Sequence, residues 1–167
     1  MGKSNRVGDL DLKYDPAHEE REWITQRIGW TLMALLALAA LIGLLGPGPL
    51  SDKTEGKIGG PLRVEYQRFG RYQAPAELKI YCRPKGREHF ELSFDRAFIQ
   101  VSEIKEISPK PDETRTDGDR YVYQFRKGDA EEHLVTFRMH GEKFGKATSN
   151  LTLDGQESVH IQIFYWP

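Results

Sequence analysis

The apolar positions of the chain form one continuous run near its N-terminus and alternate with polar positions after about residue 61. Residues 28–45 make up the run, which has no charged side chain and no Asn, Gln or His. A helix that crosses a bilayer needs roughly 17 to 25 mainly apolar residues. The run is long enough, so residues 28–45 are predicted to be a single transmembrane span.

The predicted helix begins before the span. Asp15 is a favourable N-cap and Pro16 suits the first helical position, so we expect the helix to cover residues 16–45. Pro47 and Pro49 follow it. They are expected to end the helix, because proline lacks the backbone N–H and disfavours helix in the residue before it.

A cleaved signal peptide is the alternative for this run. Such a peptide has a short basic leader, whereas residues 1–27 include six acidic side chains, so we expect an uncleaved anchor. Lys and Arg are balanced on the two sides of the span, and the positive-inside rule therefore does not decide the orientation. A short tail, one span and a folded domain are typical of a bacterial inner-membrane protein with a cytoplasmic tail (residues 1–15) and an extracytoplasmic domain (residues 61–167).

Inside the span, Ala39 and Gly43 are four residues apart, a spacing that lets two transmembrane helices approach closely. The pair predicts a packing position against another helix, in a partner or in a second copy of the chain. Small residues are also frequent in any span, so a homo-oligomer is left open.

Residues 51–60 include three glycines among mixed charges, and residues 46–60 are predicted to be a flexible linker. After Pro61 the apolar positions alternate, as in half-buried strands, and turn-forming residues separate the runs. Seven or eight short strands in residues 61–167 predict an antiparallel, Ig-like β-sandwich, with a small β-barrel as the alternative. Leu92 and Phe137 are the expected centre of the core. The alternating apolar residues are Leu62, Val64 and Tyr66; Leu78, Ile80 and Cys82; Phe90, Leu92 and Phe94; Tyr121, Tyr123 and Phe125; Val135, Phe137 and Met139; Leu151 and Leu153; and Val159, Ile161, Ile163 and Tyr165.

Composition excludes some classes of function. The formal net charge is −1, which gives no basic excess for nucleic-acid binding. Cys82 is the single cysteine and cannot form an intramolecular disulfide. We expect it to be a buried strand residue rather than a reactive thiol. The polar segment 108–119 contains four acids, but it lacks the spacing of an EF-hand and is predicted to be a solvated loop.

No catalytic or metal-binding pattern stands out in the chain. Ser102 and Lys105 match a Ser-x-x-Lys spacing that works on a helix, whereas an extended strand would point them to opposite faces. The five histidines are scattered, and no Cys-x-x-Cys or His-x-x-x-His pair exists. We therefore expect no enzyme, no cofactor and no metal site.

Two features point to interaction with a partner. The early strands and turns have a modest basic excess, which includes Arg68 and Arg71. The chain also ends in an alternating strand. If Ile163 and Tyr165 face the core, then Phe164 and Trp166 lie on the opposite face, where aromatic side chains can dock on a partner or a membrane interface.

Residues 28–30, 46–50, 61–69 and 71–75 resemble segments of a family of bacterial single-pass membrane proteins with a small β domain. The similarity covers the span and the first strand well and the remainder loosely. Members of that family occur beside YetF-like membrane proteins, so the resemblance implies a companion role, and it brings no catalytic residues.

The expected function is a non-enzymatic accessory subunit whose partners are the lipid bilayer and a membrane protein. The alternative is a small-ligand or metal-handling module on an Ig-like scaffold. Soft-metal transfer needs clustered thiols or thioethers. Cys82, Met139 and His140 would have to supply that cluster.

Overall fold

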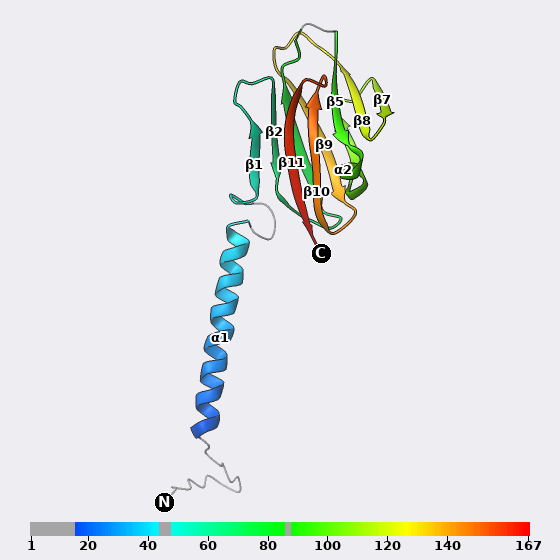
Figure 1. Ribbon diagram of the computed structural model, residues 1–167. Coiled ribbons are helices and arrows are strands. Elements are labelled where there is room, and N and C mark those ends of the chain that lie inside the picture. Colours follow the sequence, from blue (N-terminus) through cyan, green and yellow to red (C-terminus); the bar gives the residue numbers. More distant parts are fainter. Residues whose placement is uncertain (1–15, 44–47, 86–87) are drawn as a thin grey trace, which may run out of the picture. The chain divides into compact units, whose positions relative to one another are not determined.

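The computed structural model describes residues 16–43, 48–85 and 88–167 (Figure 1). The predicted N-cap Asp15 and the predicted helix end at residues 44–47 lie outside this part. The chain divides into two compact units, with the boundary between Leu38 and Ala39.

Helix α1 (Pro16–Leu41) is the one described helix long and apolar enough to cross a membrane. Its 21-residue apolar stretch from Arg21 to Leu41 would extend about 32 Å at 1.5 Å per residue, which matches a hydrocarbon core of about 30 Å. The apolar side chains are not covered by protein, and Leu38, for example, is 56% exposed. The guanidinium of Arg27 lies 4.2 Å from the ring centroid of Trp23. The predicted start of the helix at Pro16 is confirmed.

The end of α1 differs from the prediction. Helical geometry stops at Leu41, and Gly43 has a φ of 86°. The N–H of Gly43 donates to the carbonyl of Ala40 at 3.0 Å, an arrangement common where a glycine ends a helix. Gly43 therefore lies just outside the helix, two residues after Leu41, and the packing role of Ala39 and Gly43 stays a prediction.

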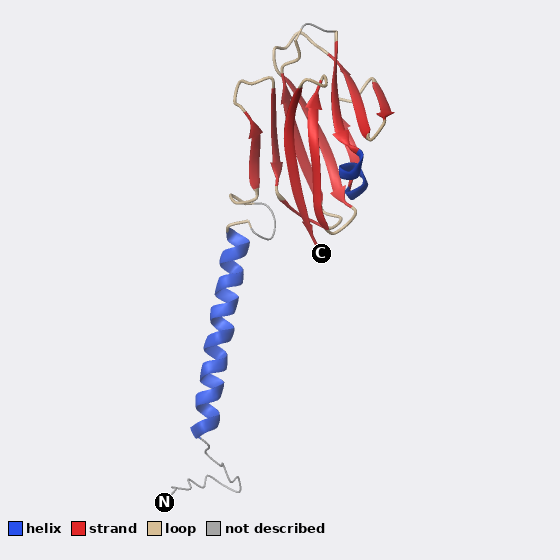
Figure 2. Cartoon of the chain, viewed as in Figure 1, coloured by secondary structure: helices blue, strands red, loops and turns tan. Residues whose placement is uncertain are grey.

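The β domain has two sheets, which dominate the chain after residue 50 (Figure 2). Sheet 1 has the strand order β1-β2-β4-β9-β6, and all its neighbours pair antiparallel. Its strands are β1 (Asp52–Gly56), β2 (Leu62–Gln67), β4 (Pro75–Cys82), β9 (His133–Gly141) and β6 (Ser102–Ser108).

Sheet 2 has the strand order β3-β11-β10-β5-β8-β7. Short β3 pairs parallel to β11, and the other neighbours pair antiparallel. A short helix, α2 (Arg96–Val101), connects β5 to β6. The strands are β3 (Phe69–Arg71), β11 (Glu157–Trp166), β10 (Gly145–Leu153), β5 (His89–Asp95), β8 (Arg120–Arg126) and β7 (Glu113–Asp117).

The inner faces of the two sheets share one hydrophobic core. Phe137 of sheet 1 lies at its centre, with its ring centroid 5.0 Å from that of Phe94 and 5.4 Å from that of Tyr123, both of sheet 2. Phe137 and Leu92 are fully buried, as predicted. The predicted sandwich is confirmed, and the described strands form two sheets rather than a closed barrel.

Several segments without an alternating pattern nevertheless form strands. The predicted linker 46–60 contains β1, and the predicted polar loop 108–119 contains β7, in which every residue is exposed. Both strands pair at a sheet edge, β1 with β2 and β7 with β8. Edge pairing needs backbone hydrogen bonds but no buried face, so the side-chain pattern gives no signal for it.

Candidate interaction surface

Strand β11 has the predicted register. Ile163 is 2% exposed and Tyr165 is fully buried, whereas Phe164 and Trp166 lie on the outer face of sheet 2 and are half-buried. The rings of Phe164 and Trp166 form an edge-to-face pair with centroids 4.8 Å apart. This geometry is favourable for aromatic rings and holds both side chains at the surface.

Strand β3 brings the predicted basic residues beside these aromatics. Phe69 pairs with Phe164, and Arg71 pairs with Trp166 in the parallel register. Gly70 between them faces inward, toward the ring of Tyr165, so Phe69 and Arg71 lie on the outer face. On the other side of β11, Lys146 of β10 pairs with Phe164. We call this surface the β11 face and define it by Phe69, Arg71, Lys146, Phe164 and Trp166.

The buried ring of Tyr165 packs beneath the β11 face, against the backbone of two glycines. A Cβ atom at Gly70 would lie 2.8 Å from the Tyr165 ring, and a Cβ atom at Gly141 would be closer still. Both sites therefore need glycine for the ring to fit. The Tyr165 hydroxyl hydrogen bonds to the buried hydroxyl of Ser102 at 3.0 Å. Burial raises the pKa of Tyr165, an effect that this hydrogen bond opposes.

The cations of the β11 face have no carboxylate partner among the described residues. Neither Arg71 nor Lys146 forms an ion pair there, and Arg68, in the turn before β3, lies with its guanidinium 5.5 Å from the Phe69 ring centroid. The other predicted basic residues behave differently. Arg63 pairs with Glu65, and Arg83 lies 3.3 Å from Glu132. The predicted basic excess therefore does not form one continuous surface: Arg63 and Arg83 are ion-paired, whereas Arg68 and Arg71 lie without a carboxylate partner beside an aromatic cluster.

The indole N–H of Trp166 is another unmet group at this surface. Its nitrogen is shielded from solvent and has no hydrogen-bond acceptor among the described residues. Buried indole N–H groups usually have a partner, because leaving one unpaired costs free energy.

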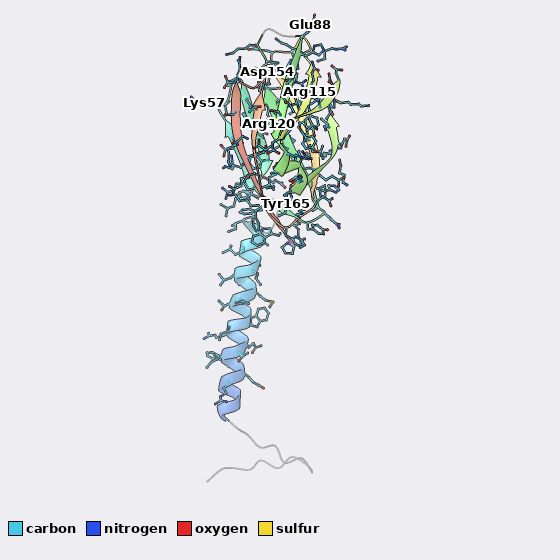
Figure 3. The ribbon with its side chains drawn as sticks, turned by 45° about the vertical axis from the view of Figure 1, so that its right-hand side comes forward. Lys57, Glu88, Arg115, Arg120, Asp154 and Tyr165 are labelled. Carbon is cyan, nitrogen blue, oxygen red and sulfur yellow. The ribbon has the colours of Figure 1, made fainter. Side chains whose placement is uncertain are left out.

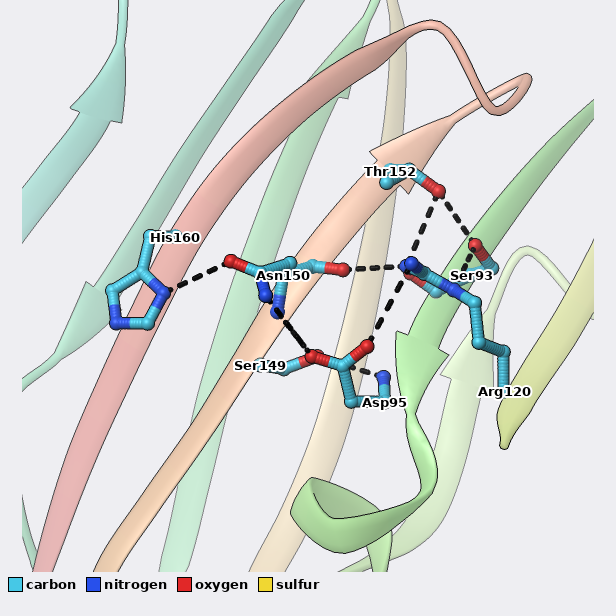
Figure 4. Close-up of polar contacts among 7 residues, drawn as sticks. All are labelled: Ser93, Asp95, Arg120, Ser149, Asn150, Thr152 and His160. Carbon is cyan, nitrogen blue, oxygen red and sulfur yellow. Dashed lines mark hydrogen bonds and ion pairs between the residues drawn. The ribbon is translucent and has the colours of Figure 1, made fainter.

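A second polar constellation lies farther along sheet 2, between β5 and β10 (Figure 4). The two strands pair through only Ser93 with Thr152 and Leu92 with Leu153. Beyond that point the Arg120 guanidinium donates to the carbonyls of Ser93, at 3.1 Å, and Asn150, at 2.5 Å. The Asp95 carboxylate accepts the backbone N–H of Asn150 at 2.7 Å. These side chains satisfy backbone groups where the strands separate.

This constellation combines the residue types of a hydrolase site without the required geometry. His160 contacts the Asn150 side chain at 3.1 Å, and the Ser93 hydroxyl contacts Thr152 at 2.6 Å. A nucleophile needs a base within hydrogen-bond reach, and no such Ser–His pair is formed here. The network therefore acts in the sheet, as a bridge between β5 and β10.

The residues of the metal-handling alternative are not brought together. Cys82 pairs with His133, whereas Met139 pairs with Ala76 at the other end of β4. At about 3.3 Å per residue these positions are roughly 20 Å apart. Burial raises the pKa of Cys82 to about 12, which agrees with the predicted buried strand residue. Among the described residues, no group of three His, Cys, Asp or Glu side chains could hold a metal ion.

Sequence patterns located the two aromatic residues and the two arginines of this surface but not the pairing that unites them. β3 has only three residues with a glycine at its centre, so alternation is too short to detect. Lys146 was missed because a single lysine in a strand has no distinguishing pattern. No family model matches this chain, and no curated protein sequence matches it.

Proposed function

We propose that this protein is a membrane-anchored, non-enzymatic accessory subunit. α1 spans the bilayer, and the sandwich presents the β11 face to a membrane-protein partner. The observation that carries the proposal is the combination at this surface of an aromatic pair, Phe164 and Trp166, with unneutralised cations at Arg71 and Lys146.

The exposed apolar helix supports the anchor. α1 has no protein covering along its apolar stretch, and burying a leucine-sized side chain away from water contributes about 1.5–3 kcal/mol. A bilayer supplies that burial for the whole stretch at once. The order of a short tail, one span and a folded domain supports a cytoplasmic N-terminus and an extracytoplasmic β domain, and the resemblance to bacterial single-pass proteins supports a YetF-like partner.

The chemistry of the β11 face suggests what the partner offers. Rigid aromatic side chains beside arginine are typical binding anchors at protein interfaces. A partner surface with carboxylates around an apolar centre would neutralise Arg71 and Lys146, and one of its oxygens could accept the indole N–H of Trp166. A second copy of this chain is the competing occupant.

The anchor is tested by extraction. The full-length chain should remain with membranes through an alkaline carbonate wash, even if the β domain unfolds in it. Leu35→Arg, in the middle of the uncharged part of the helix, should impair insertion, since an arginine at the centre of a span costs about 2.5–3.5 kcal/mol on the insertion scale. Recovery of the unchanged chain in the wash supernatant would contradict a spanning helix.

The partner surface is tested by site-specific photocrosslinking in membranes. A benzophenone amino acid at Phe164 should give a discrete adduct of higher mass, whose second component is then identified by mass spectrometry. The matched control is the same amino acid at Tyr81, on the outer face of sheet 1, which should give none. An adduct containing two copies of this chain would replace the heteromeric partner by a homo-oligomer, and equal labelling from both positions would contradict the proposal.

A further inference from the structure

An exposed aromatic pair lies at one end of the sandwich, outside the β11 face. Phe144, in the turn between β9 and β10, is 59% exposed, and Tyr72, after β3, is 38% exposed. Their ring centroids are 4.8 Å apart. We call this pair the aromatic tip.

Backbone hydrogen bonds hold the aromatic tip in place. The N–H of Tyr72 donates to the carbonyl of Trp166 at 2.8 Å, and the N–H of Gln73 donates to the carbonyl of Gly141 at 3.0 Å. The tip is thereby attached to the ends of β11 and β9. An exposed aromatic pair on such a fixed backbone loses little conformational freedom when it binds.

The chain that follows the apolar helix enters the β domain at this same end. The N–H of Leu50 donates to the carbonyl of Ile42 at 3.1 Å, so Leu50 lies beside the residue that follows α1. Buried Ser51 then accepts the N–H of Arg68 through its carbonyl, at 2.7 Å, and that of Phe69 through its hydroxyl, at 3.2 Å. Ser51 is thus attached to the start of β3, and β3 leads directly into Tyr72.

The opposite end of the sandwich is far from this entry point. Figure 3 shows Lys57, Glu88 and Asp154 toward one end of the β domain and Tyr165 toward the other. Because Tyr165 pairs with Gly70 of β3, the entry point and the aromatic tip share the Tyr165 end. If α1 spans a membrane, covalent connection alone keeps this end close to the bilayer surface.

The charges around the aromatic tip suit an anionic surface. Lys143 directly precedes Phe144, and Arg68 lies beside the entry point at Ser51; neither cation forms an ion pair among the described residues. Glu142 is the nearby acid, and it interacts with Glu103 and Lys105 on β6 instead. The tip itself therefore has an uncompensated positive charge.

We propose that the aromatic tip, with Arg68 and Lys143, rests in the anionic headgroup region of the bilayer that α1 spans. Tyrosine and other aromatic side chains favour this interface, and lysine and arginine are attracted to anionic lipids. The inference rests on the proposed anchor. Its consequence is an orientation: docking at one end holds the domain upright and leaves the β11 face free at its side.

The test uses the full-length chain in nanodiscs of phosphatidylcholine with or without phosphatidylserine. A nitroxide spin label is attached at Phe144→Cys, and buried Cys82 does not compete for the reagent. The matched control is the label at Ile58→Cys, which is 90% exposed and next to Lys57 at the opposite end. The label at residue 144 should collide more with oxygen than with a water-soluble nickel reagent, and the label at residue 58 should show the reverse.

Lipid charge supplies the second arm. Removing phosphatidylserine, or combining Arg68→Gln with Lys143→Gln, should shift the residue-144 spectrum toward the freely mobile component, by roughly fivefold in the docked-to-free ratio for each cation removed. If the two labels show the same balance of oxygen and nickel collisions in protein that stays in the nanodiscs, the docking is overturned but the anchor is not. Loss of the chain from the discs would overturn both. Dipolar broadening at residue 144 would show that a second copy covers the tip and would also overturn the proposal.

Discussion

On the outer face of sheet 1 two arginines form ion pairs with acidic side chains, whereas the cations of the β11 face of sheet 2 form none among the described residues. Arg138 of β9 bridges Glu77 of β4, at 3.1 Å, and Glu106 of β6, at 2.8 Å. Hydrogen bonds to these two carboxylates raise the pKa of Arg138. Arg63 covers the ring of Tyr81 while it pairs with Glu65.

The two faces have the same backbone alternation, so the difference lies in which residues the register places opposite one another. Sheet 1 sets acids against bases across its strands, and each pair has little left to offer another molecule. The β11 face sets cations against aromatic rings, with Arg71 beside Trp166 and Lys146 beside Phe164. A surface with unmet charge and rigid aromatics is the better candidate for binding.

The largest expected effect is the loss of folding stability at high pH, which would remove both outer faces together. Burial raises the pKa values of Cys82 and Tyr123 to about 12, and it also raises that of Tyr165. In the unfolded chain these groups lose their protons from about pH 9 to 10, while the folded chain retains them. Stability is therefore fully present below about pH 9 and falls as the pH rises toward 12.

This prediction is checked by urea unfolding of the detergent-solubilised protein at several pH values between about 9 and 12. The circular dichroism signal of the β domain reports its unfolding. Cys82→Ala removes one of the three titrating groups and should reduce the slope of stability against pH. A stability that stays constant up to about pH 11 would show that these groups titrate alike in the folded and unfolded chains.

Truncation of the core centre should have the next largest effect. Phe137→Ala removes a fully buried ring that contacts three aromatic side chains of sheet 2. The free energy of unfolding should fall by about 3–5 kcal/mol, measured by urea unfolding at neutral pH. Because both outer faces depend on this core, crosslinking from Phe164 should fall with the folded fraction and not beyond it.

Substitutions on the two faces of β11 should lower stability by different and smaller amounts. Ile163→Ala should cost about 2–5 kcal/mol, since Ile163 is buried in the core. Trp166→Ala should cost only about 1–2 kcal/mol, the worth of a half-buried aromatic pair, yet it should abolish the Phe164 adduct. If the two substitutions lower the free energy of unfolding equally, Trp166 contributes to stability as a core residue does, although it lies on the outer face.

Alternating side-chain patterns predict the strands that bury one face in the core, but not the other elements. Alternation predicted β2, β4, β5, β8, β9, β10 and β11, because each buries one face in the core and so repeats with period two. It missed β1, β3, β6 and β7, which lie at sheet edges and whose pairing depends on backbone groups. It missed α2 because six residues with one buried side chain, Phe98, have no helical period to detect.

The candidate surface shows the same limit. The outward position of Phe164 and Trp166 followed from the alternation, and the register confirms it. That Arg71 lies beside Trp166 depends on the parallel pairing of β3, a contact between segments almost a hundred residues apart. Likewise, nothing in the pattern near Gly70 or Gly141 shows that the Tyr165 ring needs both glycines.

The smallest effect on stability gives the sharpest contrast between the two faces. Arg138→Gln and Arg71→Gln each remove one exposed cation, and exposed ion pairs contribute little to folding, so both variants should unfold at nearly the wild-type urea concentration. Only Arg71 lies in register with Trp166 and lacks a carboxylate among the described residues. Arg71→Gln alone should therefore weaken the Phe164 adduct, and the remaining adduct should lose part of its dependence on salt, because screening acts on the charge that was removed. The yields are compared by quantitative immunoblotting at low and high ionic strength. If Arg138→Gln reduces the adduct as much as Arg71→Gln does, the paired and unpaired faces are equivalent, and the charge contrast does not select the binding surface.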